Sequence, residues 1–89
     1  MNRQEAIKLI CDELDKAEIK FPMWPTDPMH AVGILAEETG EVVQACIDAC
    51  YWNHIAIHKA KHEAAQVGAM ALRFIMSMDL YVCKKGEQK

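Results

Sequence analysis

Three prolines fall within seven residues, at Pro22, Pro25 and Pro28, and this stretch constrains the fold more than any other feature of the sequence. Proline has no backbone N–H to donate, so neither a helix nor a central strand can run through the stretch. Apolar residues recur at helical spacing on both sides of it. We therefore expect a stiff loop over residues 19–28 that joins two helices, with Asp27 as the N-cap and Pro28 as the first residue of the second helix.

The two helices on either side of this loop have local signals of their own. Asn2 and Glu5 fit a capping box, and apolar residues follow every three or four positions, which predicts a first helix over about residues 3–19. The second helix is expected over about residues 28–51, where the same spacing holds. No segment shows the alternation of apolar and polar residues that is typical of a half-buried strand.

A third helix is expected from His54 to about Leu80, because apolar residues keep helical spacing over that range. Asn53 is a good cap for its start, but neither glycine nor proline forces a break after the second helix, so a kinked continuation is the alternative. The pattern is lost in a polar tail over residues 82–89. The sequence therefore predicts an all-α fold with three helices.

The chain has 89 residues, of which 52% are hydrophobic. A domain of this length encloses only a small apolar core, so the remaining apolar surface should be buried between subunits. We predict a single domain over residues 1–89. It would be a three-helix subunit of a helical bundle that homo-oligomerisation completes, as a homodimer or a homotetramer. Four cysteines without close pair spacing are expected to be reduced and buried.

Charge and hydropathy exclude two classes of partner. A net charge of -3 argues against a protein that binds duplex nucleic acid, which needs a basic stripe to offset phosphate charge. The most apolar run, residues 64–72, is much shorter than the ~20 residues of a membrane span. Acidic residues at positions 12 to 15 follow the N-terminal residues closely, so no signal peptide is expected. These features together predict a cytoplasmic protein.

Two clusters with oxygen-bearing side chains mark the second and third helices. Glu38 and Glu41 are three residues apart, as are Glu63 and Gln66, so each pair should project from one helix face. At ~100° per residue, Glu38 lies next to the apolar stripe of its helix. Burying a carboxylate there is costly unless a cation or a hydrogen-bond donor compensates, and Mg²⁺ prefers such hard oxygen ligands. Spacing alone leaves open the alternative of a solvated acidic face.

The segment Leu35-Ala36-Glu37-Glu38-Thr39-Gly40-Glu41-Val42, followed after 21 residues by Glu63-x-x-Gln66, resembles the MazG-like all-α nucleoside triphosphate pyrophosphohydrolases. Their signature is Glu-x-x-Glu, a spacer and Glu-x-x-Asp, and the resemblance covers about residues 29–80. It implies hydrolysis of a (deoxy)nucleoside triphosphate to the monophosphate and pyrophosphate, with Mg²⁺ held by Glu38, Glu41, Glu63 and the fourth position. That position is Gln66 here, and an amide oxygen binds a hard cation more weakly than a carboxylate.

In such an enzyme, water attacks the α-phosphorus with metal assistance, and Glu37 or Glu41 is the candidate general base. Arg73 is a candidate phosphate ligand, with a structural ion pair as the alternative. For the substrate base, Trp24 and Trp52 are candidate stacking partners and Asn53 a candidate hydrogen-bonding partner. The alternative for the two tryptophans is that they anchor loops onto the bundle.

Two other function classes follow from the same sequence. Gln66 and the short chain are compatible with a relative that has no activity and binds a nucleotide or a protein helix. His54, His58 and His62 follow one another at intervals of four, which suits either an exposed helix face or a transition-metal sensor. A zinc peptidase is excluded, because the second histidine of the HExxH motif is absent.

Overall fold

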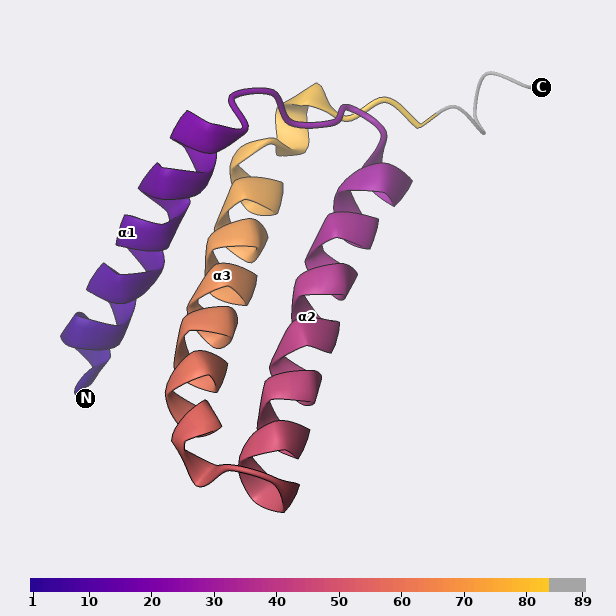
Figure 1. Cartoon of the computed structure of the whole chain (residues 1–89). Coiled ribbons are helices and arrows are strands. Elements are labelled where there is room, and N and C mark those ends of the chain that lie inside the picture. Colours follow the sequence, from indigo (N-terminus) through magenta and orange to yellow (C-terminus); the bar gives the residue numbers. More distant parts are fainter. Residues whose placement is uncertain (84–89) are drawn as a thin grey trace.

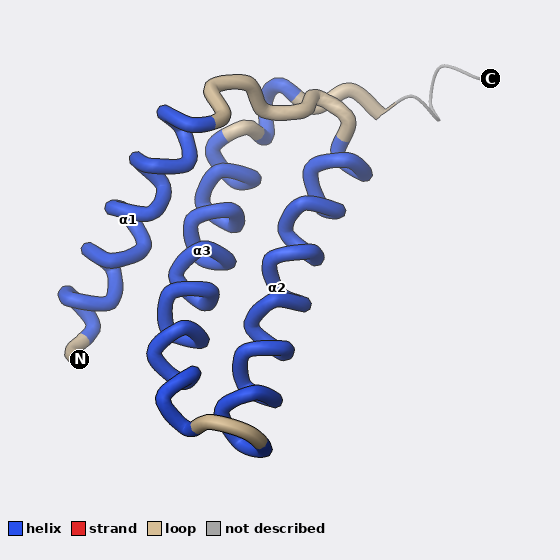
Figure 2. The backbone as a smooth tube through the Cα atoms, in the orientation of Figure 1, coloured by secondary structure: helices blue, strands red, loops and turns tan. Residues whose placement is uncertain are grey.

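In the computed structural model, which describes residues 1–83, three helices lie side by side in one layer (Figure 1). All regular structure in these residues is helical (Figure 2), so the predicted all-α fold is confirmed. The helices are α1 (Arg3–Lys20), α2 (Pro28–Tyr51) and α3 (Ile57–Met76), with 3₁₀ turns η1 (His54–Ala56) and η2 (Met78–Leu80) flanking α3.

The starts of α1 and α2 are set by the predicted capping residues. The backbone N–H of Glu5 donates to Asn2 Oδ1 over 2.8 Å, and the N–H of Asn2 donates to Glu5 Oε1 over 3.1 Å. The N–H of Met29 donates to Asp27 Oδ1 over 2.9 Å, and Pro28 occupies the first turn. These side chains satisfy N–H groups that lack partners in the first turn of a helix, and both predicted starts are confirmed.

The third helix is shorter than the sequence pattern predicts. Asn53 does act as a cap, but it starts the 3₁₀ turn η1, and the α-helix begins only at Ile57. At the other end α3 stops at Met76, where the N–H of Ser77 bonds to carbonyls of the last turn. The apolar spacing that continues past this point belongs to η2, whose Met78 and Leu80 are exposed. A pattern of period 3.6 does not distinguish such a short turn from a continuing helix. A kinked continuation of α2 is excluded, since α2 and α3 run in opposite directions (Figure 1).

Helix α3 lies in the middle of the layer, and α1 and α2 each pack against it without contacting one another. The buried cluster consists of Leu14 from α1 with Ala69 and Met70 from α3. Helix α1 approaches α3 closely at Gly68, where an added Cβ would lie 2.9 Å from Ile10 Cδ1. The space between α1 and α2 therefore stays open above α3, and the candidate site lies there.

A chain of polar contacts ties the proline-rich loop to the end of α3. Arg73 donates from Nη2 to the carbonyl of Phe21 over 2.6 Å, and its guanidinium lies 5.0 Å from the ring centroid of Trp24. The indole N–H of Trp24 donates to the Tyr81 hydroxyl over 2.9 Å, which in turn donates to the carbonyl of Phe74 over 3.0 Å. The loop is therefore fixed in place by side chains as well as by its prolines.

Two further expectations concern exposure and the C-terminal tail. All four cysteines are free, but Cys11, Cys50 and Cys83 are exposed and only Cys46 is half-buried, so the prediction of buried cysteines was wrong. Cysteine spacing could not reveal the exposure of these side chains, because exposure depends on which helix faces α3 covers. The tail expected over residues 82–89 falls outside the described residues from residue 84 onward. No helix within residues 1–83 combines the length and the apolarity needed to cross a bilayer.

Candidate active site

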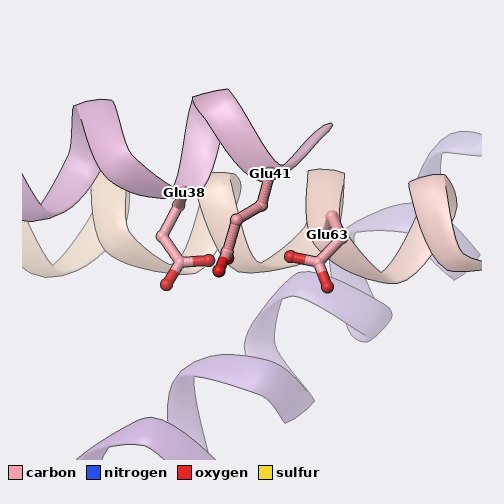
Figure 3. Close-up of side chains that lie close together, drawn as sticks. All are labelled: Glu38, Glu41 and Glu63. Atoms are coloured by element: carbon pink, nitrogen blue, oxygen red, sulfur yellow. The ribbon is translucent and has the colours of Figure 1, made fainter. Parts of the chain in front are cut away.

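Three carboxylates converge where α2 packs against α3 (Figure 3). Glu38 and Glu41 come from successive turns of α2, and Glu63 comes from α3. One oxygen of each side chain lies within 4.8 Å of the corresponding oxygens of the other two. The i, i+3 spacing places the first two on one helix face, and the antiparallel packing of α3 brings the third opposite them. Three oxygens at this separation are compatible with shared coordination of one cation.

Two oxygens of this cluster are shielded from solvent and lack hydrogen-bond partners. They are Oε2 of Glu38 and Oε2 of Glu63. A buried polar atom without a partner costs about 1–3 kcal/mol, and more when it is charged. Neither oxygen accepts a hydrogen bond from the described residues. The donor set, hard carboxylate oxygens only, fits Mg²⁺ rather than a softer transition metal.

Crowding of the three carboxylates changes how they bind protons. Burial raises the pKa of Glu38 to about 7, and the adjacent carboxylate of Glu41 and the charges of Glu63 and Glu37 add to the effect. The pKa of Glu63 is also raised, first by burial and then by Glu41, while Lys59 acts in the opposite direction. Without a cation, the site therefore holds a proton at Glu38 well above the ordinary range of a carboxyl group.

An open groove of about 660 Å³ extends from Glu38 of the acidic cluster to the proline-rich loop. It is bounded by α1, the loop and α2, above α3. Glu38 and Gln66 line the groove together with Trp24 and Arg73, so four of the predicted site residues share one cavity. Gln66 follows Glu63 by three residues on α3 and lines the same groove as Glu38. The groove also contains the lysines of the last turns of α1, Lys16 and Lys20.

Other predicted residues lie elsewhere. Glu37 is exposed and outside the group of three converging carboxylates, although its charge reaches Glu38. Trp52 is 82% exposed at the end of α2, and it lines neither of the two cavities described. Asn53 accepts a hydrogen bond from the N–H of Ile55 over 3.0 Å, which is a capping role. The structure thus separates Trp52 and Asn53 from the groove.

Arg73 and Trp24 combine groove lining with a structural role. Arg73 is only 6% exposed, and its bond to the Phe21 carbonyl and its stacking on Trp24 hold the loop. This contact set is neither of the two alternatives considered for Arg73 from sequence, because its partners are a carbonyl and an aromatic ring. Both side chains still line the groove, so they can also contact a ligand there.

Glu13 of α1 is a groove residue that the sequence analysis missed. Its side chain is 11% exposed, with Oε1 3.8 Å from His62 Nδ1 and Oε2 3.9 Å from Lys16 Nζ. Its charge reaches Glu63 and contributes to the raised pKa of that residue. A signal was present, because at ~100° per residue Glu13 lies only ~40° from Ala17 and flanks the apolar stripe of its helix. The same reasoning singled out Glu38.

The three histidines of the possible metal sensor face solvent. His54 in η1 and His58 and His62 in α3 are all exposed, as are the neighbouring lysines Lys59 and Lys61. Among residues 1–83, the only group of three or more potential ligands close enough to hold a metal ion is the carboxylate cluster. The three histidines therefore lie on an exposed face. His62 contacts one groove residue, Glu13.

No protein-family model, curated protein or solved structure matches this chain.

Proposed function

We propose that this chain is a Mg²⁺-dependent nucleoside triphosphate pyrophosphohydrolase of the MazG-like kind. The observation that carries the proposal is the convergence of Glu38, Glu41 and Glu63, two of which have a buried oxygen without a partner. These are also the three positions that the MazG-like resemblance assigns to metal ligands. The proposed substrate is a canonical or damaged (deoxy)nucleoside triphosphate, and the proposed role is upkeep of the nucleotide pool.

The proposed mechanism assigns a separate task to each part of the site. A Mg²⁺ ion held by Glu38, Glu41 and Glu63 would neutralise charge that develops on the phosphate oxygens. Glu41 is the most exposed of the three ligands, so its second oxygen is the best placed to accept a proton from the attacking water. Attack at the α-phosphorus would release the nucleoside monophosphate and pyrophosphate. Glu37 is the second candidate base, although it lies outside the cluster.

The groove supports binding of an elongated anionic ligand. It continues from Glu38 past Gln66 to Lys16, Lys20 and the buried Arg73, which together supply three positive charges. Cationic side chains at this position would offset phosphate charge that the metal does not neutralise. Trp24 lines the same groove and offers an aromatic surface near the loop. In this arrangement the triphosphate would lie near the carboxylates and the base near Trp24.

The proposed setting is a cytoplasmic homodimer or homotetramer. Support for assembly comes from the small buried cluster of Leu14, Ala69 and Met70 and from the many exposed large apolar side chains. A three-helix layer with so small a core gains stability when a second copy covers part of its surface.

The direct test is release of pyrophosphate from a panel of nucleoside triphosphates, with and without Mg²⁺. We expect turnover that requires Mg²⁺ and that falls by at least about 100-fold in Glu41→Gln, which removes one ligand and the proposed base. Glu18→Gln is the matched control, because Glu18 is exposed on α1 and outside both the groove and the cluster. Absence of release from every nucleotide, or equal rates for Glu41→Gln and wild type, would rule out the enzyme.

Gln66 favours one alternative, a relative that binds nucleotide without hydrolysing it. An amide at the fourth position weakens the metal site while leaving the groove intact. This alternative predicts calorimetric binding of a non-hydrolysable triphosphate analogue together with no pyrophosphate release. If the analogue binds in the groove, its affinity should be lower in Arg73→Met or Lys20→Met than in the wild type.

A further inference from the structure

One side of α3 carries side chains of the proposed site along most of the helix. We call it the site face of α3. With Glu63 as zero and ~100° per residue, its members lie within ~80° of one another. In chain order the five are Lys59, Glu63, Gln66, Met70 and Arg73. Glu63 belongs to the carboxylate cluster, and the residues that follow it line the groove. Lys59 is the member of this face that neither the cluster nor the groove includes.

Lys59 lies on the far side of the carboxylates from the groove. It precedes Glu63 by four residues, or about 6 Å along the helix. The groove lies in the other direction, where α3 runs toward the proline-rich loop (Figure 1). Residues four apart on a helix are neighbours, and the charge of Lys59 acts to lower the pKa of Glu63.

The ammonium group of Lys59 is available to a ligand. The side chain is exposed, and it forms no ion pair with another residue of the part of the chain that the structure describes. A lysine ammonium offers three N–H donors and a full positive charge, which suits the oxygens of a phosphate. An anion that reaches past the carboxylates on this side would therefore meet Lys59.

The groove is long enough for the nucleoside part of the proposed substrate but not for the whole molecule. Glu38 lies at its acidic end and His30 beside the loop, and the eight-residue step between them spans about 12 Å of α2. A sugar and a base occupy this length when the α-phosphate lies at the carboxylates. With the base near Trp24, the β- and γ-phosphates extend past Glu63, in the direction of Lys59.

We propose that Lys59 binds the β- and γ-phosphates of the substrate and stabilises the pyrophosphate that leaves. This inference rests on the proposed function, because it takes the carboxylates as the place of the α-phosphorus. In the reaction, the oxygen of water forms a bond to the α-phosphorus, and a proton of that water passes to Glu41. The bond from the α-phosphorus to the oxygen that bridges to the β-phosphorus breaks, and its electron pair stays on the pyrophosphate. A cation beside the leaving group offsets the charge that develops there.

The two products should therefore depend on different cations. The nucleoside monophosphate occupies the groove, where Lys20 lies, whereas pyrophosphate occupies the side of Lys59. A merely structural role of Lys59 would not separate the two affinities, because loss of structure would weaken both. The distinction can be measured by binding alone, without turnover.

The test is isothermal titration, in the presence of Mg²⁺, with pyrophosphate and with each of the four deoxynucleoside monophosphates. In Lys59→Met the dissociation constant of pyrophosphate should rise at least about tenfold, since one charge-assisted contact is lost. The affinity for the monophosphates should stay at the wild-type value. Lys59→Arg keeps the charge and should keep most of the pyrophosphate affinity.

Lys61→Met is the matched control. Lys61 is exposed on the same helix, at ~160° from Glu63, so it points away from the site face. Both affinities should equal those of the wild type. Methionine favours helix about as well as lysine does, and both positions are exposed, so neither substitution puts the fold at risk.

Turnover gives a second readout, in which kcat should fall at least about tenfold in Lys59→Met and stay unchanged in Lys61→Met. Equal pyrophosphate affinity in Lys59→Met and wild type would overturn the inference. So would a loss of that affinity in Lys20→Met alone, because the outer phosphates would then lie in the groove. A wild type that binds pyrophosphate through Lys59 but hydrolyses no nucleotide would contradict the proposed activity while supporting the contact.

Discussion

The guanidinium of Arg73 lies over the ring of Trp24, with Cζ 5.0 Å from the ring centroid, so the end of α3 and the proline-rich loop are held together by a cation and an aromatic ring. The same side chain donates to the Phe21 carbonyl, from a position that is 6% exposed. A point charge such as lysine cannot reproduce both contacts, because the planar fork of arginine makes the stacking and the hydrogen bond together.

We therefore predict that Arg73→Lys destabilises the fold by about 1–3 kcal/mol, since it loses the hydrogen bond and the stacking but keeps the charge. Chemical denaturation monitored by circular dichroism measures this loss. Lys8→Arg is a suitable control, because Lys8 is exposed and pairs with Asp12 at the surface. A stability of Arg73→Lys equal to that of the wild type would contradict the structural role assigned to Arg73.

Gln66 permits a test of the metal site by gain of function. Gln66→Asp places a carboxylate at the fourth position, one turn after Glu63, and should lower the Mg²⁺ concentration required for half-maximal binding by about tenfold. Isothermal titration with Mg²⁺ measures the change without any substrate. Gln4→Asp, in the exposed first turn of α1, controls for the added charge. An unchanged magnesium titration for Gln66→Asp would count against metal binding at this position.

Glu13 gives a test of the contribution of α1 to the site. Its charge lies close enough to raise the pKa of Glu63, so it should also attract a cation bound there. We predict that Glu13→Gln weakens Mg²⁺ binding by about tenfold, in the range for residues that support metal ligands. The Mg²⁺ titration is best made at about pH 8, above the pKa of about 7 of Glu38. Glu18→Gln serves as the control, and equal affinities for the two variants would remove Glu13 from the site.

The parts of the fold that were predictable depend on local interactions. Capping by Asn2 and Asp27 acts within a few residues, and the prolines of the loop act on their own backbone, so both helix starts follow from sequence. The end of α3 did not follow from sequence, because residues beyond Met76 keep apolar spacing although the α-helix has ended. That end is fixed by tertiary contacts such as the 2.9 Å hydrogen bond from the N–H of Val82 to the carbonyl of Thr26.

Within the candidate site, the same distinction holds. Helical angles placed Glu38 beside the apolar stripe, and the spacing of Glu63 from Gln66 placed both on one side of α3, so the cluster could be anticipated. The groove could not, because it forms only where α1 and α2 pack on α3 without meeting. Arg73 contacts a carbonyl 52 residues away, and no periodicity within α3 indicates such a partner.

The raised pKa of Glu38 predicts that stability depends on pH and on Mg²⁺ together. In the folded chain this pKa is about 7, against an ordinary value of 4.5. Between these values the folded state holds a proton that the unfolded state has released. The stabilising contribution is therefore complete below about pH 4.5 and is lost as the pH rises through about 7.

Without divalent cations, we expect the melting temperature to fall between about pH 5 and about pH 8. Mg²⁺ should reverse this fall at about pH 8, where the ionised carboxylates bind it, and should have little effect at about pH 5; at a hundred times its dissociation constant it would add about 2.7 kcal/mol. Glu38→Gln mimics the protonated side chain, so it should flatten the pH dependence and abolish most of the stabilisation by Mg²⁺. Equal stabilisation by Mg²⁺ at both pH values, or in Glu38→Gln and wild type alike, would place the cation elsewhere.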